Sequence, residues 1–226
     1  MKYTLIALAA FFVHFSGFSQ RDDHSKYFVK FSPTQLIVGE MNFAFEHRVA
    51  PQSSLEVSFG PTVSEIGINK IYFDNVLNNN NATYGLNSRT QSGLGFFLGL
   101  SYRYYPISGA STAPRGLYLG PEIKYRMYNT YYIDNLGVLE NRTGSANQLL
   151  FRFHTGYQFV IGKKFAIDVF TALGLGYTVI NAYYDIQLYN SQTGGFTTSW
   201  YSKTRNRVFV SGSVGVKFGL GGNRKD

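Results

Sequence analysis

Twelve ionisable side chains lie in segments where large apolar residues alternate with polar or small ones. Within its own segment, each of the twelve occupies a position of the polar series, which we call the polar parity. Carboxylates and imidazoles can act as general acids and bases, and together with cations they can fill a buried space as salt bridges. Because successive residues of a β-strand point to opposite faces, residues of one parity line one face of a sheet. The set comprises Lys30, Glu46, Arg48, Glu56, Arg103, Glu122, Lys124, Arg126, Arg152, His154, Asp168 and Lys217.

His154 is the candidate general base of this set, because it lies in the middle of an alternating segment beside acidic neighbours. A base of this kind needs a positioned nucleophile. The chain has no cysteine, and its His-x-Ser sequence, His14-Phe15-Ser16, lies in the apolar N-terminal segment. We therefore interpret His154 as a structural residue and expect no catalytic residue.

Metal and cofactor sites are not indicated by the spacing of the candidate ligands. His24, His47 and His154 are far apart in sequence, and there is no cysteine to assist them. Gly93-x-Gly95 and Gly174-x-Gly176 lack the strand-to-helix context of a phosphate-binding loop. We expect no metal and no cofactor.

The elements that carry these residues are predicted to be β-strands. From Leu94 to Tyr105, large apolar residues on one parity alternate with Gly, Ser and Arg on the other, and no helix would keep that period. The chain contains 18 Tyr and 20 Phe with only 15% charged residues, as expected when aromatic side chains face something other than water. The same alternation predicts eight strands, at about 26–33, 35–49, 54–67, 93–106, 115–130, 146–161, 165–181 and 206–219.

The composition of the two parities indicates which face would be inside. One parity mixes ions with Gly and bulky residues, as in Gly120, Glu122 and Lys124, which suits a narrow interior. The other is nearly free of charge, as in Phe151 and Phe153, and contact with lipid requires this. In hydrocarbon every backbone polar group needs a partner, so the eight strands must close on themselves. We predict an all-β, closed, eight-stranded, antiparallel, up-and-down transmembrane β-barrel.

The predicted lumen is a salt-bridged plug. Arg48 should lie near Glu56 across the hairpin that joins strands 35–49 and 54–67. Glu122 and Asp168 lie on the strands that flank the strand of Arg152. A buried ion is costly unless it is paired, so a cluster of mixed sign is what a filled lumen needs.

The N-terminus has the pattern of a cleaved secretory signal peptide. Lys2 precedes an apolar core from Thr4 to Val13, and Gly17-Phe18-Ser19 offers small residues for cleavage. We assign residues 1–19 to the leader and 20–226 to one barrel domain. No later run of about 18 apolar residues occurs.

The predicted connections alternate between short and long. Segments 50–53, 107–114 and 162–164 are compact, whereas 68–92, 131–145 and 182–205 are long and polar. Outer-membrane barrels have short periplasmic turns and long extracellular loops. The long segments are therefore candidate contacts for a surface ligand or protein.

Net charge does not indicate a nucleic-acid partner. The formal charge is +8, from 21 Lys and Arg against 13 Asp and Glu. The basic residues are scattered along the strands and do not line one helix or loop, so a charged interior accounts for them better than a nucleic-acid surface.

Three motifs support a family resemblance that extends over nearly all of the mature chain. They are Leu36-Ile37-Val38-Gly39-Glu40 leading to Phe45-Glu46-His47-Arg48, Gly156-Tyr157-Gln158-Phe159 before a Gly-Lys-Lys turn, and Ala172-Leu173-Gly174-Leu175-Gly176-Tyr177. The chain resembles the small eight-stranded outer-membrane barrels of the OmpA transmembrane domain and OmpX type, and most closely their uncharacterised members. That resemblance implies fold and membrane location, and no activity. Barrels of this kind often end on an aromatic residue, whereas here eight residues follow Phe218.

These observations predict an integral protein of the bacterial outer membrane, in contact with its lipid. We expect a structural or surface-interaction role, exercised through the long loops, and no enzymatic activity. The alternatives are an enzyme that modifies lipid or peptide at the barrel rim, a narrow channel, and a soluble lipocalin-like binder.

Overall fold

The computed structural model describes residues 25–63, 89–106, 114–133, 139–162, 164–190 and 195–222. The predicted signal peptide, residues 1–19, lies outside these residues and stays a prediction. Within the described part of the chain no helix combines the length and the apolar character needed to cross a membrane.

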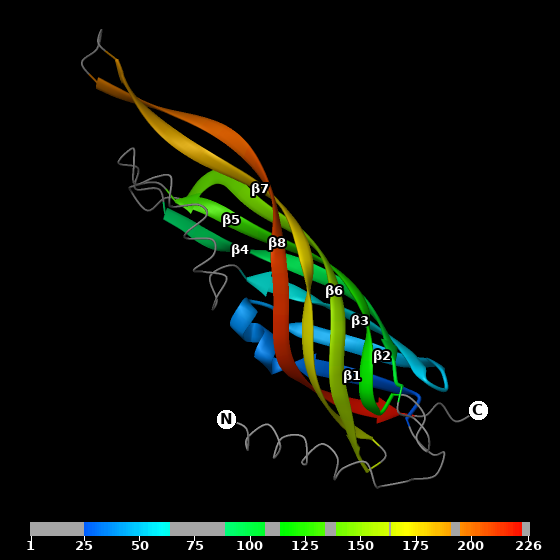
Figure 1. The fold of residues 1–226 in the computed structure, drawn as a ribbon. Helices are drawn as coiled ribbons and strands as arrows, with labels where there is room; N and C mark the ends of the chain where they lie inside the picture. The colour runs from blue at the N-terminus through cyan, green and yellow to red at the C-terminus, as the bar shows by residue number, and fades with distance from the viewer. Residues whose placement is uncertain are drawn as a thin grey trace, which may run out of the picture.

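Eight antiparallel strands are hydrogen-bonded in a closed ring, in sequence order, with β1 also pairing with β8 (Figure 1). This confirms the predicted fold class as an all-β, eight-stranded ring. The elements are β1 (Tyr27–Ser32), the 3-10 helix η2 (Pro33–Val38), β2 (Asn42–Ala50), β3 (Ser53–Val63), β4 (Arg89–Tyr104), β5 (Gly116–Ile133), β6 (Leu139–Ile161), β7 (Phe165–Asn190) and β8 (Gly195–Gly222).

The ring is uneven because its strands differ greatly in length. β1, β2 and β3 have 6, 9 and 11 residues, whereas β7 and β8 have 26 and 28. The β7–β8 ladder is continuous from Phe165↔Leu220 to Asn190↔Gly195, so this hairpin extends far beyond the short strands (Figure 1). β1, β2 and β3 therefore end far short of the tip of the β7–β8 hairpin. We call the end of the ring that carries this tip the upper end.

The predicted strand 35–49 is wrong over its first residues. Residues 33–38 form η2, and β2 begins only at Asn42. Pro33 starts the 3-10 helix, and Gly39, with φ of 70°, ends it in a left-handed conformation that suits glycine. Leu36, Ile37 and Val38 resemble a strand in sequence because they are apolar, but the proline and glycine on either side bound a short turn.

Two of the predicted long loops are largely strand. β5 and β6 extend into 131–145, and β7 and β8 cover most of 182–205. Polar residues resemble a loop in sequence, but the paired strands satisfy each other's backbone groups in long hairpins. The predicted loop 68–92 lies outside the described residues apart from the start of β4.

Candidate functional site: an ion-paired lumen

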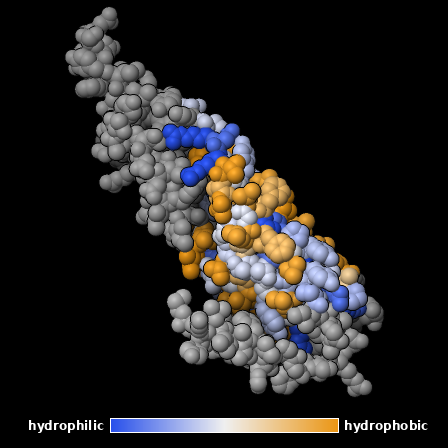
Figure 2. Space-filling model, in the orientation of Figure 1, coloured by the Kyte–Doolittle hydropathy of each residue, from blue (hydrophilic) through white to orange (hydrophobic). Residues whose placement is uncertain are grey.

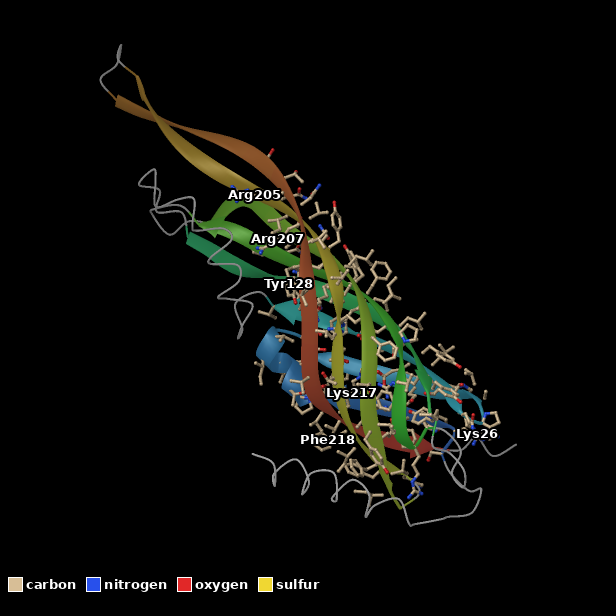
Figure 3. All side chains as sticks on the ribbon, viewed as in Figure 1. Lys26, Tyr128, Arg205, Arg207, Lys217 and Phe218 are labelled. Atoms are coloured by element: carbon tan, nitrogen blue, oxygen red, sulfur yellow. The ribbon has the colours of Figure 1, made fainter. Side chains whose placement is uncertain are left out.

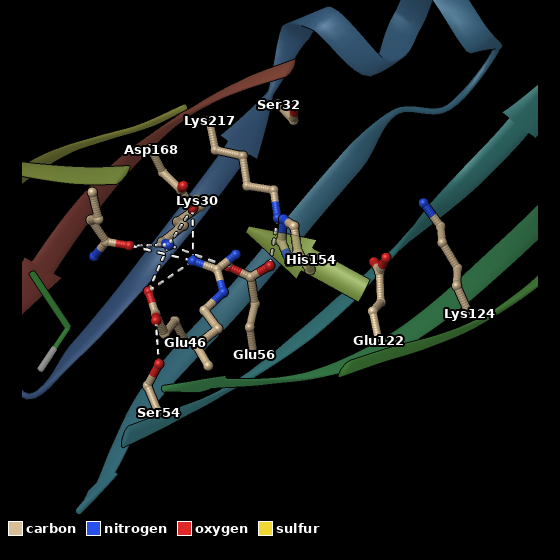
Figure 4. Close-up of polar contacts among 12 residues, drawn as sticks. Lys30, Ser32, Glu46, Ser54, Glu56, Glu122, Lys124, His154, Asp168 and Lys217 are labelled. Carbon is tan, nitrogen blue, oxygen red and sulfur yellow. Dashed lines mark hydrogen bonds and ion pairs between the residues drawn. The ribbon is translucent and has the colours of Figure 1, made fainter. Parts of the chain in front are cut away.

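The lower lumen holds a cluster of three cations and three carboxylates, which are Lys30, Arg103, Lys217, Glu46, Glu56 and Asp168 (Figure 4). They come from β1, β2, β3, β4, β7 and β8, so the cluster joins opposite sides of the ring. All six side chains are buried. Because the signs balance, each charge has a partner.

Asp168 and Lys30 each contact several other members of this cluster. Asp168 Oδ2 lies 2.9 Å from Lys30 Nζ and 2.8 Å from Arg103 Nη1. Lys30 Nζ also lies 2.6 Å from Glu46 Oε2 and 3.2 Å from Glu56 Oε2. Removal of one member would therefore deprive more than one buried charge of one of its partners.

Arg103 and Lys217 share Glu56. Arg103 Nη2 lies 2.6 Å from Glu56 Oε2, and Lys217 Nζ lies 2.5 Å from Glu56 Oε1. The two cations also contact aromatic faces: the Arg103 guanidinium is 4.3 Å from the Tyr118 ring centroid and Lys217 Nζ is 4.6 Å from that of Phe170. Aromatic faces attract cations, so these rings add to the stabilisation of the buried charges.

Neutral polar groups add hydrogen bonds to two of the carboxylates, Asp168 and Glu46. The Tyr118 hydroxyl donates to Asp168 Oδ1 at 2.7 Å, and the Tyr105 hydroxyl donates to Glu46 Oε1 at 2.8 Å. The Ser54 hydroxyl also donates to Glu46. Buried charges are tolerated when both ion pairs and hydrogen bonds satisfy them.

A second group of ions lies higher in the lumen. Arg152 Nη2 is 2.7 Å from Glu122 Oε2, which joins β5 and β6. Glu40 Oε2 lies 2.5 Å from Lys124 Nζ, and Glu40 Oε1 lies 2.5 Å from Arg126 Nε. Glu40 follows η2 in the connection to β2, so an ion pair anchors that connection to β5 inside the ring.

The structure also separates residues that the sequence pattern grouped together. Arg48 lies opposite Ser54, two residues along β3 from Glu56. Glu56 itself is ion-paired with Lys30, Arg103 and Lys217. Asp168 contacts Lys30 and Arg103, whereas Glu122 pairs with Arg152.

His154 lies buried among aromatic rings. Its ring meets those of Tyr118 and Phe170 edge-on, with centroids 5.3 and 5.1 Å apart, and its Nε2 is 3.5 Å from the Tyr118 hydroxyl. That hydroxyl is the one that donates to Asp168. The imidazole is therefore placed as a packing and hydrogen-bonding group of the lumen.

Glu40, Tyr105, Tyr118 and Gln158 were missed as members of the network. Glu40 has the same parity as Glu46, and that parity is the signal that could have found it. Gln158 accepts from Lys30 at 2.7 Å, a contact across the ring that strand spacing does not reveal.

No group of three or more His, Cys, Asp or Glu residues in the described part of the chain could hold a metal ion. The arrangement that is present fills the ring with paired ions and aromatic side chains. Its chemistry is electrostatic, and it holds opposite walls of the ring together.

The outside of the ring is apolar where the inside is ionic. On β6, Phe151 and Phe153 are 55% and 54% exposed. Arg152 and His154, which alternate with them along the strand, are only 6% and 1% exposed. Figure 2 shows apolar side chains distributed along the face in view. Exposed members on other strands include Val29, Phe59, Leu94, Leu98, Leu173, Leu175, Val208, Val210, Val214 and Leu220.

Comparison with protein-family models, with curated proteins and with solved structures finds no match to this chain.

Proposed function

We propose that this chain is an integral β-barrel of the bacterial outer membrane. The observation that carries the proposal is the inverted side-chain distribution, with exposed apolar residues outside and ion pairs inside. Water would not favour so many exposed large apolar side chains, whereas hydrocarbon requires them. The predicted leader at residues 1–19 supports export from the cytoplasm.

The role we propose is structural or surface-interacting, without enzymatic activity. The lower lumen is occupied by paired ions and the upper lumen by Glu40 and its partners, which supports a filled barrel over a diffusion channel. The segments 68–92, 131–145 and 182–205 supply the proposed contacts with a surface ligand or protein. Among the described strands, the β7–β8 hairpin extends furthest from the ring (Figure 1).

Membrane fractionation and extraction test this proposal. Membranes from expressing cells should retain the protein after washes with high salt and with alkaline carbonate, and detergent should release it. The folded barrel should also migrate differently from the heated protein on a gel. Release by salt alone would contradict the proposal and favour a soluble binder.

A further inference from the structure

One edge of β8 is only partly covered. β1 pairs with this edge from Phe218 to Gly222. Side chains of the η2 region cover the next positions: the Val216 N–H donates to Thr34 Oγ1 at 3.0 Å, and the Ser32 hydroxyl donates to the Val216 carbonyl at 2.9 Å. Above them, from Asn206 to Gly212, no strand of the described residues pairs with this edge. We call 206–212 the open edge.

Arg207 is exposed because of this gap. It has the same parity as Ser211 and Lys217, which point into the ring and are only 5% and 4% exposed. Arg207 itself is exposed, since the short strands β1–β3 end below it. Arg205, of the same parity, is partly buried, and Figure 3 places both arginines on the upper half of β8. Within the described residues no carboxylate forms an ion pair with Arg207.

The residues that alternate with these arginines are strongly apolar. Val208 is 66% exposed, and Val210 and Val214 are each 73% exposed. Tyr177, opposite Val208 on β7, is also exposed. The open edge thus combines an apolar surface with cationic side chains at its upper end.

The height of this surface matches a membrane boundary. The outward apolar residues of β8 run from Leu220 to Val208, which spans about 40 Å along a strand at about 3.3 Å per residue. With the tilt of about 45° usual in such barrels, this is about 28 Å of membrane depth, close to the hydrocarbon thickness. Arg205 and Arg207 then lie at the level of the lipid headgroups.

We propose that the open edge of β8 binds a phosphate-bearing lipid of the outer leaflet. Its acyl chains lie on Val208, Val210 and Val214, and its phosphate accepts hydrogen bonds from Arg207. A guanidinium fits a phosphate with two parallel N–H donors. The inference rests on the proposed membrane location of the chain.

The edge backbone strengthens the case for a polar headgroup. The N–H and C=O groups of Val216 point away from β7, so those of Val208 and Val210, two-residue steps along the same strand, point the same way. Unpaired backbone groups are costly in hydrocarbon. A headgroup beside Val208 can accept from its N–H, and backbone N–H groups are known donors in anion sites.

Binding of defined lipids to the purified protein tests this proposal. Native mass spectrometry would compare bisphosphorylated lipid A with its dephosphorylated form, on the wild type, Arg207→Gln and Arg48→Gln. Arg48 is a partly buried cation near the opposite end of the ring and serves as the matched control. Wild type and Arg48→Gln should retain the phosphorylated lipid, and Arg207→Gln should bind it about tenfold more weakly, the loss expected for one charge-assisted contact.

Equal retention of the two lipids, or unchanged binding by Arg207→Gln, would overturn the proposal. Recovery of a protein strand crosslinked along 206–212, with no lipid bound, would overturn it as well. The heat-dependent gel shift of Arg207→Gln checks that the variant folds. A wild type that inserts into vesicles but shows no preference for phosphate refutes only this inference, whereas a wild type that does not insert refutes the membrane proposal itself.

Discussion

At the scale of single residues, the main determinant of stability is the pairing of buried ions across the lumen. Asp168 contacts Lys30 and Arg103 and accepts from Tyr118. Ions removed from water are costly when unpaired, so each member depends on its partners. This makes substitution inside the ring far more damaging than loss of a cation near its end.

Asp168→Asn should lower the free energy of unfolding by about 3–5 kcal/mol. The substitution keeps the shape of the side chain but leaves Lys30 and Arg103 without one of their carboxylates. Urea unfolding of the protein refolded in lipid vesicles would measure the change.

Arg48→Gln is the control for this prediction. Arg48 is only partly buried and lies opposite Ser54, so its replacement should change the free energy of unfolding by no more than about 0.5 kcal/mol. Equal effects of the two substitutions would show that the buried cluster adds no stability of its own.

Parity in the sequence indicated which residues face inward, but it could not indicate which of them pair. Residues such as Glu56, Arg103 and Asp168 come from strands that are distant in sequence and meet across the ring. The pairing depends on strand register and on the width of the lumen. Glu56 is an example, because it lies opposite Glu46 in the hairpin and is ion-paired with cations from β1, β4 and β8.

At the scale of elements, η2 substitutes for the missing upper part of β1. The helix ends the pairing of β1, and its neighbouring hydroxyls take over the backbone groups of Val216 on β8. Where the β1–β8 pairing stops at Phe218, side-chain hydrogen bonds from Ser32 and Thr34 therefore continue the contact with β8.

Thr34→Val should lower the free energy of unfolding by about 1 kcal/mol, because the Val216 N–H loses its acceptor in a part-buried site. The exchange of that amide hydrogen with deuterium should also accelerate. Amide protection of Val216 equal to that of the wild type would contradict the role given to η2.

Close packing of β4 against β5 depends on Gly120. A Cβ at this position would collide with the backbone carbonyl of Tyr102, which cannot move without breaking the sheet. Gly120→Ala should therefore abolish the folded form on a gel or reduce its yield several-fold.

Gly212→Ala is the matched control, because the nearest atoms to a Cβ at that position are 3.8 Å away. This variant should fold like the wild type. A normal yield of Gly120→Ala would mean that β4 and β5 can separate locally at no cost.

The alternation of residues predicted most strands, and it failed at specific places for physical reasons. An apolar run at 36–38 resembles a strand, although Pro33 and Gly39 confine it to a turn. The ends of β7 and β8 at 182–190 and 195–205 carry many polar residues, so in sequence these ends resembled a loop. Apolar alternation reports contact with an apolar environment, and strands that leave it lose the signal.

At the scale of the whole molecule, the ring encloses its ion-paired clusters and exposes many large apolar side chains on its outside. A soluble barrel has the opposite arrangement, with apolar residues around the axis. The wall of the ring is also uneven, because β1, β2 and β3 are short and β7 and β8 are long (Figure 1). The exposed apolar side chains are the feature that fits a surrounding of lipid.

Fluorescence quenching by brominated lipids tests this arrangement most directly. The chain has one tryptophan, so Trp200→Phe gives a silent background in which Phe153→Trp places a single reporter on the outward face of β6. In vesicles whose acyl chains carry bromine, the reporter should be strongly quenched, and iodide in the water should have little effect. Quenching by iodide with none by brominated lipid would contradict the account.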